Sequence, residues 1–160
     1  MKKINVSILF VALFVPLVIG VASAMLSADG MEIYTTMAKP PLSPPGWVFS
    51  VAWTILYLLM GLCSYLVVMS VGEMEDKRFA LCLYVIQLVM NFWWSIIFFN
   101  GRMYLFAFIW LVIMWCIVIV CTMKYYGISK LAAYLMIPYI LWLTFAAYLN
   151  MGAYVLSKAL

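Results

Sequence analysis

The sequence predicts an all-α integral membrane protein, a bundle of five transmembrane helices. Of its 160 residues, 70% are hydrophobic and only 9% are charged. A soluble domain of this length needs a polar exterior, so the composition indicates that lipid surrounds the chain. In lipid only helices and closed barrels satisfy their backbone hydrogen bonds. The apolar runs are long and continuous, without the alternation of barrel strands, so they predict helices.

The first apolar run extends from about residue 4 to residue 26 and has two interpretations. Lys2 and Lys3 precede it and Ala22-Ser23-Ala24 closes it, which is the pattern of a cleaved secretory signal. The run is also long enough to span a bilayer, at ~1.5 Å per residue against roughly 30 Å of hydrocarbon. The residues leave both interpretations open.

Residues 27–45 form the long polar connection of the chain. A connection of this length is expected to have a role of its own, such as a lid over a pocket. Its second half is rich in proline, which lacks a backbone donor and pushes the preceding residue out of the α region. A rigid loop that leads directly into an aromatic membrane helix is typical of a ligand site. The residues that define this rigid loop are Lys39, Pro40, Pro44, Pro45 and Gly46.

The other apolar runs predict four further helices in the same single domain, residues 1–160. Pro138 lies inside the last run and should kink that helix near Leu135. Ser129 is placed to cap the start of the same helix. The four runs cover about residues 46–71, 79–99, 104–123 and 130–156.

The distribution of positive charge predicts the orientation in the membrane. Five spans place the termini on opposite sides, with six Lys and Arg residues on the N-terminal side and three on the other. The positive-inside rule therefore predicts a cytoplasmic N-terminus, with residues 27–45 and the C-terminus outside. The net charge of +4 is explained by this topology and does not indicate a nucleic-acid partner.

Several kinds of chemistry are disfavoured by the composition. Histidine is absent, which removes the commonest metal and haem ligand and the usual general base. The four cysteines lie inside apolar runs without metal-binding spacing, so we expect no metal site. No Asp, Glu, Lys or Arg falls inside a predicted span, which argues against an ion pump or a proton-coupled carrier.

Three of the predicted helices carry aromatic and polar residues on one face. Such faces would line an aromatic cavity suited to a large, flat, apolar ligand. The alternative is that they pack helix against helix, with the amide of Asn91 bonded to a neighbouring helix. The faces comprise Trp53 and Tyr57 on the second helix, Asn91, Trp94, Ser95 and Phe98 on the third, and Trp142, Phe145, Ala146 and Leu149 on the fifth.

Three sequence motifs resemble the TspO/MBR family of translocator proteins, in order and in spacing. The first runs from Tyr34 through Lys39-Pro40 and PPGWVFSVAWTILYLLMG, the second is NFWWSIIFF at 91–99, and the third is PYILWLTFAAYLN at 138–150. The resemblance covers nearly the whole chain. It implies five transmembrane helices with the first one retained, usually a homodimer, here in a bacterial cell membrane.

The resemblance also implies a function. The family binds porphyrins such as protoporphyrin IX, and synthetic isoquinoline and benzodiazepine ligands, so we expect a receptor or sensor in tetrapyrrole handling. Trp53 and Trp142 match pocket tryptophans implicated in light-dependent porphyrin degradation, and Tyr34 matches the loop tyrosine that covers the ligand. Ala146 matches a small residue whose bulk alters ligand affinity. Porphyrin degradation and tetrapyrrole transport remain alternatives.

Two positions depart from the family pattern. Lys158 lies eight residues after Asn150, whereas the sterol motif places its basic residue soon after that asparagine, so sterol binding is not expected. Ile33 stands where an aromatic often precedes the loop tyrosine, so the lid is expected to close less firmly.

Overall fold

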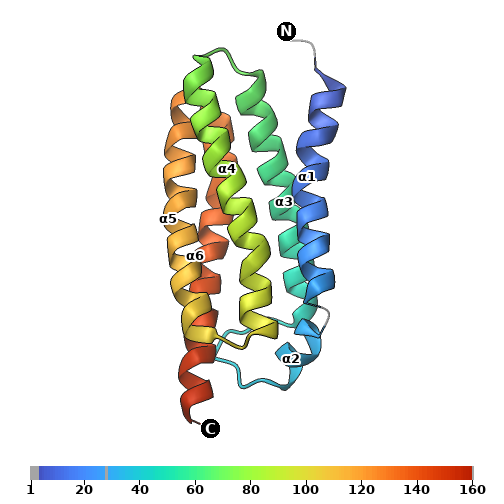
Figure 1. The fold of residues 1–160 in the computed structure, drawn as a ribbon, viewed down its shortest axis with the longest axis vertical. Helices are drawn as coiled ribbons and strands as arrows, with labels where there is room; N and C mark the ends of the chain where they lie inside the picture. The colour runs from blue at the N-terminus through green and yellow to red at the C-terminus, as the bar shows by residue number, and fades with distance from the viewer. Residues whose placement is uncertain (1–3, 28, 160) are drawn as a thin grey trace.

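The protein is a bundle of long helices, described by a computed structural model at residues 4–27 and 29–159 (Figure 1). Five of its helical segments are long and apolar enough to cross a membrane, which confirms the predicted fold class. A short π-helical turn, η1, continues the third of these segments. The elements are α1 (Val6–Leu26), α2 (Gly30–Thr36), α3 (Gly46–Met69), α4 (Met74–Ser95), η1 (Ile96–Asn100), α5 (Tyr104–Ile128) and α6 (Lys130–Ala159).

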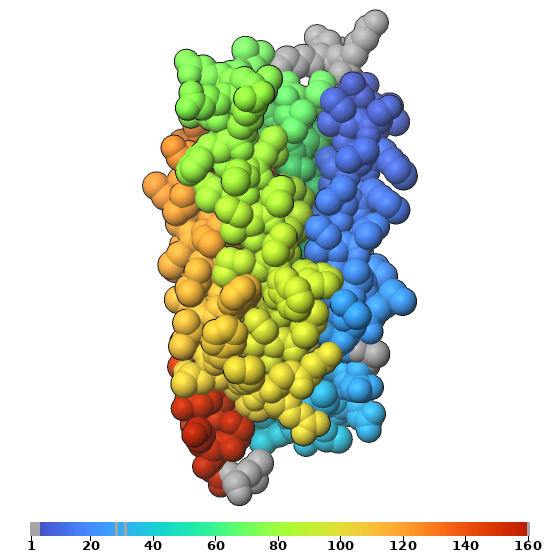
Figure 2. Space-filling model, viewed as in Figure 1, coloured from blue at the N-terminus to red at the C-terminus, as the bar shows by residue number. Residues whose placement is uncertain are grey.

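The long helices form a closed ring in a different order from the chain. Contacts join α1 to α3, α3 to α6, α6 to α5, α5 to α4, and α4 back to α1. Helix α1 lies at one edge of the bundle (Figures 1 and 2). Its outward side chains, such as Phe10 and Phe14, are 64% and 54% exposed. In a membrane this apolar exterior faces lipid.

Helices α4 and α5 each extend about one turn or more beyond a predicted end. Helix α4 begins at Met74 rather than near residue 79, and its first turn contains Glu75 and Asp76. Carboxylates there are stabilised by the positive end of the helix dipole, so the charged segment begins the helix instead of forming a turn. Helix α5 continues to Ile128 rather than ending near residue 123.

The ends of α3 and α6 also differ from expectation. Helix α3 ends at Met69, where the Lys77 ammonium donates to the carbonyl of Ser70 and satisfies part of the helix terminus. Helix α6 is continuous through Pro138 and reaches Ala159. Its start is capped as expected, because the Ala132 amide donates to Ser129 Oγ at 3.4 Å.

The expected loop 27–45 contains a helix that the sequence reasoning missed. Helix α2 occupies Gly30–Thr36 and lies across one end of the bundle (Figure 1). Gly30 faces the ring of Phe99, and a Cβ at Gly30 would lie 3.1 Å from that ring. Helix α2 is therefore seated against the end of η1, and the segment after it is irregular.

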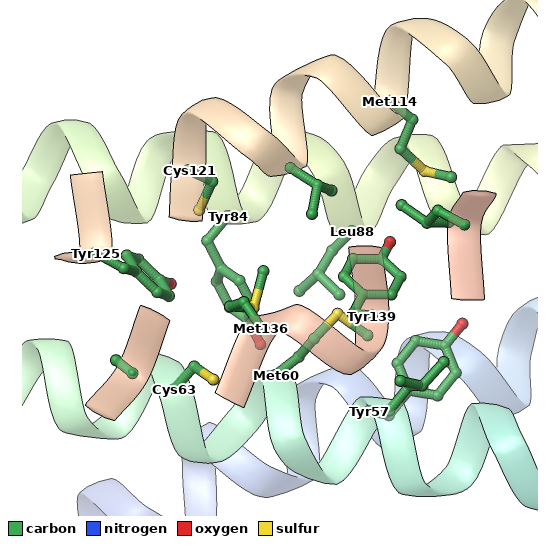
Figure 3. Close-up of a cluster of buried hydrophobic side chains, with 14 of the residues drawn as sticks. Tyr57, Met60, Cys63, Tyr84, Leu88, Met114, Cys121, Tyr125, Met136 and Tyr139 are labelled. Atoms are coloured by element: carbon green, nitrogen blue, oxygen red, sulfur yellow. The ribbon is translucent and has the colours of Figure 1, made fainter. Parts of the chain in front are cut away.

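The core between α3, α4, α5 and α6 is filled by methionine, leucine and tyrosine side chains. Figure 3 shows Met60, Leu88 and Met136 meeting from three different helices. Cys63 and Cys121 are buried in the same cluster. These two thiols act here as small apolar side chains.

The backbones of helices α1 and α3 pass close to each other at Gly61. A Cβ at this position would lie 2.5 Å from the carbonyl oxygen of Ala12. Only glycine leaves room for the α1 backbone here, and small residues at such crossings are typical of membrane bundles.

We predict that Gly61→Ala destabilises the bundle by about 1–3 kcal/mol, because α1 must move away from α3. Gly127→Ala is the matched control, since a Cβ there has no neighbouring atom within 4 Å. The control should be neutral or stabilising by about 0.5–1 kcal/mol, the ordinary gain of alanine over glycine in a helix. Thermal unfolding of both proteins in detergent measures the difference, and equal midpoints would contradict the prediction.

Candidate functional site

A cavity of about 410 Å³ opens at the α2 end of the bundle. Trp53 and Tyr57 of α3, Trp94 of α4 and Phe98 of η1 contribute aromatic walls. Among the described residues that line the cavity, only Lys39 carries a charge. The cavity therefore suits a ligand with a large apolar surface and little charge.

Helix α3 supplies a row of aromatic rings because of its residue spacing. Phe49, Trp53 and Tyr57 are four residues apart and share one face. The rings of Trp53 and Tyr57 stack with centroids 5.5 Å apart and an interplanar angle of 29°. Pro45 precedes the first residue of the helix, where no helical backbone donor is lost. The proline loop thus starts the helix so that this face turns toward the cavity.

Trp142 lies behind this wall and is not among the residues that line the cavity. Its ring packs edge-on against Trp53 at 6.4 Å and against Phe49 at 5.8 Å. Phe145 packs in turn on Trp142, with centroids 5.9 Å apart. Trp142 Nε1 is buried and has no hydrogen-bond partner among the described residues. Trp142 therefore supports Trp53 and keeps a free donor next to it.

Asn91 also lies behind the wall, at the centre of a buried hydrogen-bond network. The Tyr57 hydroxyl donates to Asn91 Oδ1 at 2.6 Å. Asn91 Nδ2 donates to the Tyr139 hydroxyl at 3.2 Å, and that hydroxyl donates to Gln87 Oε1 at 2.8 Å. This network joins α3, α4 and α6 and fixes Tyr57 in the cavity wall.

A second polar contact fixes the opposite wall. Trp94 Nε1 donates to Asn150 Oδ1 at 3.3 Å, and Asn150 Nδ2 donates to the carbonyl of Tyr104 at 2.7 Å. The ring of Trp94 stacks on Phe98 with centroids 5.1 Å apart. Helices α4, α5 and α6 are thereby held together beside the cavity.

Tyr34 of α2 covers the cavity. Its hydroxyl donates to the carbonyl of Pro44 at 2.6 Å, and its ring packs edge-on against Phe49 at 5.0 Å. Lys39 Nζ lies 4.7 Å from the centroid of the same ring, in a cation–π contact. Burial raises the pKa of the Tyr34 phenol above its usual value, and a hydrogen bond with Ser43 partly offsets this. The hydroxyl is therefore a donor throughout the neutral range.

The proline loop is fastened to α6. The Tyr148 hydroxyl donates to the carbonyl of Pro41 at 2.8 Å. Pro40 packs on Gly152, where a Cβ would lie 2.5 Å from the Pro40 side chain. Leu42 adopts a left-handed backbone conformation with φ of 65°. These contacts hold the loop over the cavity as a fixed cover between α2 and α3.

The structure brings most of the predicted site residues to one cavity. Asn91, Trp142 and Phe145 stand behind the wall, and Pro44, Pro45 and Gly46 shape the loop without lining the cavity. Whether the lining residues bind a ligand stays a prediction. The predicted residues that do line the cavity are Tyr34, Lys39, Pro40, Trp53, Tyr57, Trp94, Ser95, Phe98, Ala146 and Leu149.

Sequence reasoning missed the contribution of α1. Gly20 lies against the ring of Tyr57, and a Cβ there would approach that ring to 2.2 Å. Ser23 donates from Oγ to the carbonyl of Phe92 at 2.9 Å and closes the ring between α1 and α4. The small residues from Gly20 to Ala24 were the available signal, since such stretches allow close helix approach. Phe49 was also missed, although it lies four residues before Trp53.

Fold and cavity together define the class, a polytopic α-helical membrane protein with a lidded aromatic cavity inside the bundle. Comparison with protein families then identifies the family. The TspO/MBR family profile matches residues 12–156, and the chain belongs to that family.

Three relatives illustrate the range of the similarity, two from bacteria and one from a mammal. The tryptophan-rich protein TspO of Chlorobaculum tepidum is 32% identical over 149 residues, covering 91% of this chain and 94% of that protein. The translocator protein of Homo sapiens is 37% identical over 131 residues, covering 81% and 78% respectively. The tryptophan-rich sensory protein of Cereibacter sphaeroides is 35% identical over 130 residues, again covering 81% and 78%.

We predict that Tyr34→Phe lowers stability by about 0.5–1.5 kcal/mol, because the Pro44 carbonyl loses its donor. Because the pKa of Tyr34 is raised in the folded state, the contribution of its hydroxyl to stability is fully present below the unfolded pKa of about 10. That contribution is lost as the pH rises through the higher pKa of the folded state. Thermal midpoints of wild type and variant should therefore differ by a constant amount from pH 6 to 9 and converge above pH 10.

Tyr126→Phe is the control, since Tyr126 is exposed near the end of α5 that lies away from the lid. Its midpoints should follow those of wild type at every pH. If the difference in thermal midpoint between wild type and Tyr34→Phe disappeared between pH 6 and 9, the assignment of the hydroxyl as a donor would be contradicted.

Proposed function

We propose that this chain is a membrane receptor or sensor that binds porphyrins, with protoporphyrin IX as the ligand, in the cavity under Tyr34. The supporting observation is the aromatic cavity, whose stacked Trp53 and Tyr57 rings offer a flat apolar surface to a flat apolar ligand. Membership of the TspO/MBR family supports the same ligand class. Isoquinoline- and benzodiazepine-type compounds would occupy the same cavity.

The porphyrin would bind without its metal. The sequence contains no histidine, so the commonest axial ligand to haem iron is missing from the cavity. Stacking on aromatic walls does not require a metal in the ring. Metal-free protoporphyrin should therefore bind more tightly than haem.

The proposal includes the orientation and the assembly. We place the start of α1 in the cytoplasm and the lid outside, because six Lys and Arg residues fall on the first side and three on the second. The receptor would work as a homodimer in the cell membrane, as the family resemblance implies.

We predict that Ala146→Phe weakens protoporphyrin IX binding at least about tenfold, because the new ring fills the cavity. Ala146 is buried and lines the cavity from α6. Quenching of tryptophan fluorescence in the dark gives the affinity. Cys116→Phe is the control, because Cys116 is exposed on α5 away from the cavity and its replacement should leave binding unchanged. Equal affinities for both variants would contradict the assigned cavity.

Light-dependent oxidation of the bound porphyrin is the second candidate function. The observation that favours it is the contact between oxidisable rings, since Trp53 touches Tyr57, Tyr139 and Trp142 at centroid distances of 5.5, 6.2 and 6.4 Å. An electron removed from one ring of such a cluster can be replaced by an electron from a neighbouring ring. No histidine is present for ordinary acid–base turnover, so receptor function remains our first proposal.

If the second function holds, illumination of the wild-type complex in air should bleach the porphyrin bands faster than a detergent-only control. Trp53→Phe and Trp142→Phe should slow the bleaching while dark binding persists, because phenylalanine is harder to oxidise than tryptophan. Absorption spectra recorded over time provide the measurement. Bleaching at the wild-type rate in both variants would rule out a role for these indoles.

A further inference from the structure

A second cavity of about 300 Å³ lies beside the first, at the same end of the bundle. It is bordered by α2 and the residues that follow it, by the turn between η1 and α5, and by the last turns of α6. Its polar lining consists of Arg102 and the hydroxyl-bearing residues Thr36, Tyr104 and Ser157. Among the described lining residues no carboxylate is present and Arg102 is the only charged group. The site is therefore electrostatically suited to an anion.

The two cavities adjoin. Met37 and Ala153 line both of them and form the partition between them. The ring of Phe98, in the first cavity, packs against Tyr104, in the second, with centroids 5.1 Å apart. A ligand in the first cavity is thus separated from the second by single side chains.

Arg102 is held in its position by a strained turn. The amides of Gly101 and Met103 donate to the carbonyls of Ile96 and Ile97, at 3.0 and 3.3 Å, and terminate η1. Arg102 takes the left-handed conformation of this cap, with φ of 50°, where glycine is usual. Gly101 itself is not left-handed. Glycine would adopt this backbone conformation at a lower energetic cost. The presence of arginine here therefore indicates that its side chain has a function.

Within the described part of the chain, no acidic group pairs with the Arg102 guanidinium. It makes no ion pair or side-chain hydrogen bond within the residues that the structure describes. Lys39, the charged residue of the first cavity, contacts the face of the Tyr34 ring and no acidic group among the described residues. Each of the two adjoining cavities therefore presents one cation and, among its described lining residues, no acid.

Resting on the proposed porphyrin-binding function, we propose that the ligand is a flat dicarboxylate whose two acid arms are held by Lys39 in the first cavity and Arg102 in the second. Protoporphyrin IX has this form, since its two propionates extend from neighbouring pyrrole rings at one edge of the disc. The disc stacks on the Trp53 wall, and the acid edge faces the lid end. Two cations then select dicarboxylic porphyrins over neutral flat molecules of the same size.

The test compares protoporphyrin IX with its dimethyl ester, which keeps the disc and removes both charges. Wild type, R102Q, K39Q and the double variant are titrated at pH 7.5 in a non-ionic detergent without phospholipid. We expect R102Q to weaken binding of the acid about three- to tenfold, as for a partly exposed charge-assisted contact, and to leave the ester unchanged. The losses in K39Q and R102Q should multiply in the double variant, because each cation meets a different arm.

R78Q is the matched control, since Arg78 is an exposed cation near the start of α4, at the end of the bundle away from the lid. It should bind acid and ester as wild type does. Equal loss of acid and ester binding in R102Q, or no loss of either, overturns the carboxylate assignment. So does an R102Q effect that appears only after phospholipid is added, because the guanidinium would then bind a lipid phosphate.

The outcomes also separate this inference from the proposed function. If wild type binds the ester and R102Q binds the acid normally, only the Arg102 assignment fails. If wild type binds neither the acid nor the ester, the porphyrin receptor itself fails, and the inference fails with it.

Discussion

Polar groups buried in a membrane bundle are costly unless they find partners inside the protein, because lipid offers no hydrogen bonds. The network of Tyr57, Asn91, Tyr139 and Gln87 meets this constraint, and the rest of the structure depends on it. All four side chains are buried, and they lie on three different helices. Moving any one of these helices would leave a donor or an acceptor unpaired in hydrocarbon. The network therefore fixes the positions of α3, α4 and α6 relative to one another.

The hydrogen-bond network also makes the cavity wall rigid. Tyr57 is at once a member of the network and a lining residue, and Trp53 stacks directly on it. Trp142 packs behind Trp53, so the wall is two rings deep. The alternatives left open by the sequence, cavity lining and helix packing, thus both apply, to different residues. Trp53 lines the cavity, whereas Trp142 and Asn91 pack behind it and hold the lining residues in place.

Composition was enough to predict five membrane helices, because lipid permits few other structures. Spacing was enough to find the α3 face of the cavity, because Trp53 and Tyr57 are separated by a helical repeat. Helix α1 could not be assigned to the cavity in this way, since it is mostly apolar and its small residues from Gly20 to Ala24 indicate close helix packing without marking a cavity. The short helix α2 was hidden for a different reason. Its seven residues make too few turns to show a period, and its place depends on contact with Phe99, far away in the sequence.

The need to pair buried polar groups also explains why the two sides of the cavity differ in how firmly they are held. The α3 and α6 side is fixed by the central network, and Asn150 ties α6 to the start of α5. The α1 side is joined to α4 and η1 through two hydrogen bonds, from Ser23 Oγ to the Phe92 carbonyl and from Asn100 Nδ2 to the Leu26 carbonyl. Most of α1 is exposed and carries few polar groups that need partners. A change in cavity shape is therefore less costly on the α1 side, because it leaves fewer buried polar groups unpaired.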